Sequence, residues 1–110
     1  MSTSSTDSDC EIVQRIAIGD RQALSELYIR YQRSLFNYLL QLTPDYGLAE
    51  ELLQDTLVAV WKSARGFEGR STVQTWLMGI ARRQASLWLR RRGPAAHLLP
   101  LLAAAGAPLA

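Results

Sequence analysis

Two helical segments joined by a short loop occupy residues 48–92, and they constrain the fold more than any other part of the sequence. The first, LAEELLQDTLVAVW (48–61), is acidic on one side. The loop reads KSARGFEGR (62–70), and the second segment, STVQTWLMGIARRQASLWLRRR (71–92), is basic and aromatic. Apolar residues recur at helical spacing in both segments, so we expect two packed helices.

Two further helical segments precede this pair. Apolar residues recur at helical spacing between Ile12 and Ala17, and Gly19 is expected to end this helix. Asp20 is a suitable N-cap for the next helix, which carries a broad apolar stripe and should run to about residue 43. The sequence Thr-Pro-Asp-Tyr-Gly over 43–47 then breaks the helix.

The third helix is expected over roughly 47–64 and the fourth from Ser71. Ser71 with Gln74 three residues later predicts a capping box, and Gly93-Pro94 should close the helix. No segment of useful length alternates as a strand would. The predicted fold class is therefore all-α, a small three- to four-helix bundle.

The two ends differ in composition from the helical domain predicted over 10–92. Residues 1–9 are rich in Ser, Thr and Asp and are expected to form a disordered tail. Residues 93–110 consist mainly of Ala, Leu and Pro and carry no formal charge. We expect this second tail to be disordered, and the alternative is that its leucines cover an apolar patch of the bundle.

Charge is distributed unevenly along the chain. Residues 1–55 carry nine acidic residues and four arginines, a formal charge of −5, whereas residues 56–110 carry eight basic residues and one acid, a charge of +7. Such asymmetry suggests a polyanionic partner for the second half. An ordinary solvated charge distribution is the alternative.

Several function classes are disfavoured. Cys10 is the only cysteine, which rules out an internal disulfide and suits a reducing cytoplasm. No secretory signal is recognisable, and Pro100 and Pro108 interrupt the apolar tail, so we expect a cytoplasmic protein without a membrane partner. The single histidine is His97, and no catalytic set, metal-ligand set or nucleotide-binding loop is present. We therefore expect no enzyme activity and no cofactor.

The third helix has two different faces. Its expected core face consists of Ala49, Leu52, Leu53, Thr56, Val60 and Ala64. The opposite face carries Glu51, Gln54, Asp55, Val58 and Trp61. A valine and a tryptophan among solvated acids expose apolar area, which is typical of a protein interface. The alternative is that Trp61 packs against the first helix or the loop at Phe67.

The fourth helix combines cations with aromatic residues. Its expected core positions are Val73, Trp76, Leu77, Ile80, Gln84 and Leu87. Eight cations lie between residues 62 and 92, interleaved with Phe67, Trp76 and Trp88. Cations bind phosphates and aromatic rings stack on bases, which suits single-stranded or opened nucleic acid. The run at 90–92 alone says less, because cations are favoured at any helix C-terminus.

Three blocks resemble a known family at matching spacing. They are D-x-x-A-L-x-x-L-Y-x-x-Y (20–31), A-E-E-L-L-Q-D-T-L-x-x-V-W (49–61) and T-W-L-x-x-I-A-R (75–82). Together they resemble region 2 of bacterial extracytoplasmic-function (group four) sigma factors of the sigma-70 family. The resemblance covers about two-thirds of the chain, and the middle block is the most specific.

The resemblance implies a bundle that docks on core RNA polymerase and recognises and helps melt the promoter minus-ten element. It implies contacts to a clamp coiled coil of the largest subunit from Glu51, Gln54, Asp55, Val58 and Trp61. It also implies capture of a flipped base of the non-template strand. The implied DNA-binding residues are Lys62, Arg65, Phe67, Arg70, Ser71, Thr72, Thr75, Met78, Gly79, Arg82, Arg83 and Arg90. Trp76 matches a family aromatic, but its angular position favours the core.

Three departures from the family pattern bear on function. Arg83 stands where the family usually has Asn, and Arg only donates hydrogen bonds, so the base preference stays open. Leu87 stands where Asp is common. No segment resembles the second helical domain that reads the minus-thirty-five element, so the chain is a domain of a longer protein, a truncated product or a stand-alone region 2 protein.

Three hypotheses follow. The first is a transcription initiation subunit, or its polymerase- and DNA-binding domain. The second is a region 2 protein that binds core polymerase or an anti-sigma factor without opening promoters. The third, a generic basic helical protein with accidental resemblance, is disfavoured by the ordered motifs. The promoter sequence, anti-sigma partner, inducing signal and oligomeric state do not follow from the sequence.

Overall fold

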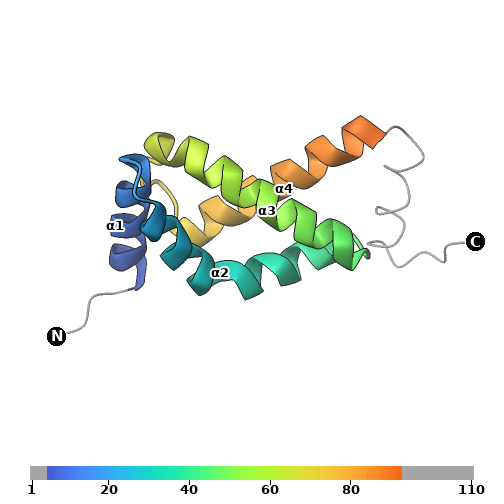
Figure 1. Ribbon diagram of the computed structural model, residues 1–110, viewed down its shortest axis with the longest axis horizontal. Coiled ribbons are helices and arrows are strands. Elements are labelled where there is room, and N and C mark those ends of the chain that lie inside the picture. Colours follow the sequence, from blue (N-terminus) through green and yellow to red (C-terminus); the bar gives the residue numbers. More distant parts are fainter. Residues whose placement is uncertain (1–4, 93–110) are drawn as a thin grey trace, which may run out of the picture.

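The computed structural model of the protein describes residues 5–92, which fold into four α-helices and one 3₁₀ turn (Figure 1). The elements in chain order are α1 (Ser5–Ala17), α2 (Arg21–Leu42), α3 (Tyr46–Ser63), η1 (Ala64–Gly66) and α4 (Val73–Arg92). Helices α2, α3 and α4 pack on one another, and α1 lies across one end of them (Figure 1). No strand occurs among residues 5–92, so the all-α, four-helix prediction is confirmed.

The turn between α1 and α2 is fixed by two backbone hydrogen bonds. Gly19 has a φ of +93°, a left-handed conformation that suits glycine, and its N–H donates to the Ile16 carbonyl at 2.9 Å. The Asp20 N–H donates to the Arg15 carbonyl at 3.0 Å, which completes a Schellman motif. Asp20 also caps α2, because its Oδ1 accepts from two backbone N–H groups of the first turn. The predicted stop at Gly19 and cap at Asp20 are confirmed.

The end of α2, both ends of α3 and the start of α4 match the predictions to within two residues. Asp45 caps α3, and its Oδ1 accepts from the Leu48 N–H at 3.2 Å. The cap of α4 differs from the predicted capping box at Ser71. Thr72 Oγ1 accepts from the Thr75 N–H at 3.1 Å, whereas the Ser71 hydroxyl donates to the Thr72 carbonyl. Thr72 directly precedes the first helical residue, so its hydroxyl, one residue later than predicted, reaches the orphan N–H group.

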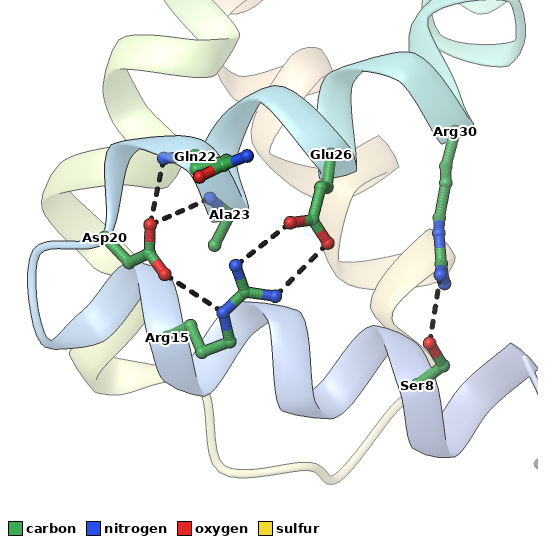
Figure 2. Close-up of polar contacts among 7 residues, drawn as sticks. All are labelled: Ser8, Arg15, Asp20, Gln22, Ala23, Glu26 and Arg30. Carbon is green, nitrogen blue, oxygen red and sulfur yellow. Dashed lines mark hydrogen bonds and ion pairs between the residues drawn. The ribbon is translucent and has the colours of Figure 1, made fainter.

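The tail that the sequence predicted over 1–9 overlaps α1, because the helix begins at Ser5. Asp9 is only 3% exposed. The Asp9 carboxylate accepts hydrogen bonds from Arg30 Nη1 at 2.6 Å and from the Tyr31 hydroxyl. Arg30 Nη2 also donates to Ser8 Oγ at 3.0 Å (Figure 2). Ser8 and Asp9 thus contact partners on α2 that are distant in the sequence, and local composition does not reveal such contacts.

The buried face of α3 is the predicted one, because all six expected core positions are buried. Helix α4 differs. Its buried positions follow one another at intervals of four residues, and they are Val73, Leu77, Ala81 and Ala85. Four positions expected in the core are instead half-buried, and they are Trp76, Ile80, Gln84 and Leu87. Small alanine side chains are suited to close packing between helices. The helical projection gave most weight to large apolar residues, so it did not identify the alanines as buried.

No helix among residues 5–92 has the length and apolar content that a membrane span requires. The predicted helix end at Gly93-Pro94 and the predicted tail over 93–110 lie outside the described residues.

Candidate functional site

The outward side of α3 carries five residues that we call the α3 ridge. Glu51, Gln54 and Val58 are exposed, and Asp55 and Trp61 are half-buried. Val58 retains 52% of its surface, although the buried face of the same helix is fully apolar apart from Thr56. The Thr56 hydroxyl donates to the Leu52 carbonyl at 2.7 Å, so this polar group is satisfied within the helix. The ridge therefore stands on a helix whose inner face is firmly packed.

The acidic side chains of the α3 ridge have no partner among the described residues. Within 5–92, neither Glu51 nor Asp55 forms an ion pair or a side-chain hydrogen bond. Because solvent-accessible carboxylates without such partners can meet cations of another molecule, the ridge presents negative charge next to the apolar surface of Val58 and Trp61.

Trp61 ends the α3 ridge and also packs on the protein core. It lines a surface hollow of about 370 Å³ between the end of α3 and the turn that follows α1. The other residues that line this hollow are Ile16, Ala17, Ile18, Gly19, Lys62 and Arg65. Trp61 therefore lies close to the end of the first helix, in line with the alternative interpretation of this residue. Its side chain is only half-buried, so part of it stays accessible on the α3 ridge.

The segment between α3 and α4, which we call the loop 64–72, holds an aromatic pair. The rings of Phe67 and Trp76 lie 4.9 Å apart between centroids at an interplanar angle of 48°. Beside them is a shallow hollow of about 190 Å³, which Arg70 and Ser71 also line. Gly69 has a φ of +75°, which lets the chain turn back toward α4. Trp76, expected in the core, packs against the core while half-buried and also contributes to this loop surface.

The outer face of α4 carries exposed arginines. Thr75, Gly79, Arg82 and Arg90 are exposed and follow one another at intervals of four, three and eight residues, so they lie on one side of the helix. Arg83, next to Arg82 in the sequence, is also exposed. None of the three arginines forms an ion pair among the described residues. This face therefore presents positive charge without internal compensation.

The predicted DNA-binding residues do not all meet in one place. Around the hollow of the loop 64–72 the structure brings together Phe67, Arg70 and Ser71, with Thr72 and Thr75 nearby at the start of α4. Arg70 forms an exposed ion pair with Glu68 at 3.0 Å. Arg90 lies about 22 Å farther along α4 than Thr75 at 1.5 Å per residue.

Two further predicted DNA-binding residues have other surroundings. Met78 is half-buried and packs against the core. Arg65 turns toward α1, where its Nε donates to the Ala17 carbonyl at 3.2 Å. Lys62 is exposed at the end of α3, next to Trp61 in the 370 Å³ hollow. Sequence spacing did not reveal the Arg65 contact, because it joins residues 48 positions apart.

Charged side chains join α1 to α2 at the turn between them (Figure 2). The Arg15 guanidinium lies between two carboxylates, with Nε 3.0 Å from Asp20 Oδ2 and Nη2 2.9 Å from Glu26 Oε2. Hydrogen bonds from Arg15 lower the pKa of Glu26 below its ordinary value. The pKa of Asp20 is also lowered, first by the Ala23 N–H and then by Arg15. This network links the end of α1 to the start of α2.

The sequence of the chain matches a known protein family. Residues 27–94, more than half of the chain, match the sequence model of Sigma-70 region 2. The chain belongs to this family. The resemblance to extracytoplasmic-function sigma factors is thereby confirmed at the level of family.

Curated relatives agree with this assignment. The chain is 39% identical over 66 residues to the ECF RNA polymerase sigma factor SigX of Bacillus subtilis (strain 168), covering 60% of this chain and 34% of SigX. It is 35% identical over 71 residues to the RNA polymerase sigma factor YlaC of the same strain, covering 64% of this chain and 41% of YlaC. The chain thus spans well under half the length of these relatives.

A solved structure shares the fold. It is the NMR structure of the complex formed by an engineered region 2 of sigmaE with GTAAAA. The likeness has a TM-score of 0.71 at 25% sequence identity, and it covers 83% of this chain and 95% of that one. Four helices of this region 2 type are therefore the architecture of the chain.

Proposed function

We propose that the chain acts as the region 2 part of a transcription initiation factor, which docks on core RNA polymerase and recognises the promoter minus-ten element. Membership of the Sigma-70 region 2 family supports this function, as do relatives named RNA polymerase sigma factors. The observation that carries the proposal is the succession of an acidic ridge on α3 and a cationic face on α4, whose charges form no ion pair within residues 5–92. Both tasks are binding events in the cytoplasm and need no covalent chemistry.

The α3 ridge would bind the clamp coiled coil of the largest polymerase subunit. Glu51 and Asp55 are free to meet basic side chains, and Val58 with Trp61 supplies the apolar area. Binding energy usually concentrates in a few large side chains that are surrounded by polar contacts. Trp61 has this setting, because acids precede it on a helix that the core holds in place. We therefore assign the main contact to Trp61.

The loop 64–72 and α4 would bind the non-template strand of the minus-ten element, with one base turned out of the stack. Turning out a base costs a few kcal/mol, which stacking on an aromatic ring offsets by roughly 1–3 kcal/mol. Phe67 and Trp76 provide such rings beside the hollow of the loop 64–72. Arg82 and Arg83 would neutralise phosphates. The complex of the engineered region 2 of sigmaE with GTAAAA supports this assignment.

Titration of a fluorescently labelled single-stranded DNA hexamer GTAAAA with the 110-residue chain tests the DNA half of the proposal. We expect weak binding at low salt, with log affinity falling against log salt by about 0.7 per phosphate contacted. Arg82→Gln should weaken binding and lower this slope by about 0.7. Arg33→Gln is the matched control, since Arg33 is exposed on α2 and lines a different hollow, beside Phe36 and Glu50, that no residue of the loop 64–72 lines.

Absence of binding at low salt would favour the second function. In that case the protein would bind core polymerase or an anti-sigma factor without opening promoters. Equal effects of the Arg82 and Arg33 changes would show that the DNA contact is not localised on α4, which contradicts the proposed orientation.

A further inference from the structure

Ile18, in the turn between α1 and α2, is the most exposed large apolar side chain of the described residues, at 82%. The turn that presents it is not loose. The Schellman hydrogen bonds fix its backbone, the ion pair of Arg15 with Asp20 spans it, and Arg65 Nε donates to the Ala17 carbonyl. A side chain on a rigid support loses little conformational freedom on binding, which is favourable at an interface.

The surface next to Ile18 is hollowed and partly apolar. Ile16, Ala17 and Trp61 line the 370 Å³ hollow together with Ile18. Two cations, Lys62 and Arg65, line the same hollow. Because Trp61 belongs both to this hollow and to the α3 ridge, the two surfaces are continuous.

We propose that this corner, formed by Ile18, Trp61, Lys62 and Arg65, is a second contact for the polymerase segment that binds the α3 ridge. This inference rests on the proposed function. The occupant is a helical segment that places an apolar side chain in the hollow and a carboxylate beside Lys62 and Arg65. Charge supports one orientation, because the ridge is acidic and the corner is basic. The bound segment therefore carries basic residues toward the ridge and acidic residues toward the corner.

The assignment also changes the expected role of Arg65. The sequence placed Arg65 among the DNA-binding residues, but its Nε is directed to the last residue of α1. A cation at a helix C-terminus is favoured by the helix dipole and satisfies an orphan carbonyl. Arg65 thus holds the corner in place and presents its remaining donors to a protein partner.

Binding of the 110-residue chain to purified core RNA polymerase, measured by fluorescence anisotropy, tests the proposal. Ile18→Ser should weaken binding about tenfold, because a buried isoleucine contributes at least one power of ten to affinity. Ile29→Ser is the matched control, since Ile29 is 69% exposed on α2 and does not line this hollow, and it should change binding less than twofold. Both changes should leave the melting temperature and the affinity for the GTAAAA hexamer unchanged.

A double change of Ile18→Ser with Trp61→Ala should weaken binding less than the product of the single effects, because both residues line one hollow. Normal binding of Ile18→Ser alongside weakened binding of Trp61→Ala would overturn this inference and leave the proposed function intact. Failure of the unchanged protein to bind core polymerase would instead remove the proposed function. Loss of hexamer binding in Ile18→Ser, or loss of self-association, would overturn the inference by identifying DNA or a second copy as the occupant.

Discussion

Gly79 lies in the middle of α4 on its exposed side, where neither backbone conformation nor packing requires a glycine. Its φ is not positive, and an added Cβ would meet no atom within 4 Å. A glycine inside a helix costs roughly 0.5–1 kcal/mol relative to alanine. Since Arg82 is three residues farther along the same face, we interpret the open position as room for the backbone of a bound nucleic acid.

Gly79→Ala should therefore have opposite effects on stability and on binding. We expect the free energy of unfolding to rise by about 0.5–1 kcal/mol, because alanine favours the helix and meets no neighbour. The affinity for the GTAAAA hexamer should fall several-fold, because the added methyl group occupies the space that we assign to the nucleic-acid backbone. Urea unfolding and fluorescence titration measure the two quantities, with exposed Gln74→Ala as control. A more stable protein with unchanged affinity would exclude the interpretation.

At the scale of the elements, we expect the pairing of α1 with α2 to depend on pH. The pKa values of Asp20 and Glu26 are lowered in the folded protein, so the stabilisation by Arg15 is fully present above their ordinary values of 3.8 and 4.5. It is lost as the pH falls through the lowered values. The melting temperature should therefore fall with decreasing pH below about 4.5.

Glu26→Gln tests this origin of the acid sensitivity. The variant should melt at a lower temperature than the unchanged protein at pH 7. The difference between the two melting temperatures should shrink as the pH falls below about 4.5. Thermal unfolding followed by circular dichroism gives both values. Glu50→Gln serves as control, because Glu50 is exposed and forms no ion pair among residues 5–92. A constant difference between the curves at all pH values would contradict the role of the carboxylate.

The elements that sequence patterns predicted well are those fixed by local signals, either large apolar side chains at helical spacing or a glycine and a capping residue at a turn. The faces of α3 and the caps at Gly19 and Asp20 are of this kind. What the sequence did not predict depends on long-range contacts or on small residues. The burial of Asp9 needs α2, and the direction of Arg65 needs α1. Ala81 and Ala85 supply half of the buried positions of α4, although neither residue is prominent in a projection.

The same limit applies to the candidate site. The α3 ridge follows from the projection of a single helix, and the structure places its five residues on the outward side as expected. The aromatic surface of the loop 64–72 cannot be predicted from a helical projection, because the pairing of Phe67 with Trp76 depends on how the loop folds back on α4. The roles of these residues in binding stay predictions.

At the scale of the whole molecule, the two proposed surfaces lie on different helices and carry opposite charge, so changes in one should not affect the other. Trp61→Ala should weaken binding to core polymerase by about 2 kcal/mol and leave hexamer binding unchanged. Because Trp61 also packs on the core, this change should lower the melting temperature as well. Val58→Ser is the second variant, since Val58 is 52% exposed and its loss should weaken polymerase binding without unfolding the protein.

Arg82→Gln should show the reverse pattern, with weaker hexamer binding and unchanged affinity for core polymerase in the absence of DNA. Combining Val58→Ser with Arg82→Gln should reproduce each single effect within roughly 0.3–0.5 kcal/mol, because residues without shared contacts contribute independently. Anisotropy titrations with labelled protein for the polymerase, and with labelled hexamer for DNA, provide the affinity of each variant for each ligand. An Arg82→Gln variant that loses polymerase binding as strongly as the Val58→Ser variant would show one shared surface, and the proposed division of α3 and α4 between protein and DNA would be wrong.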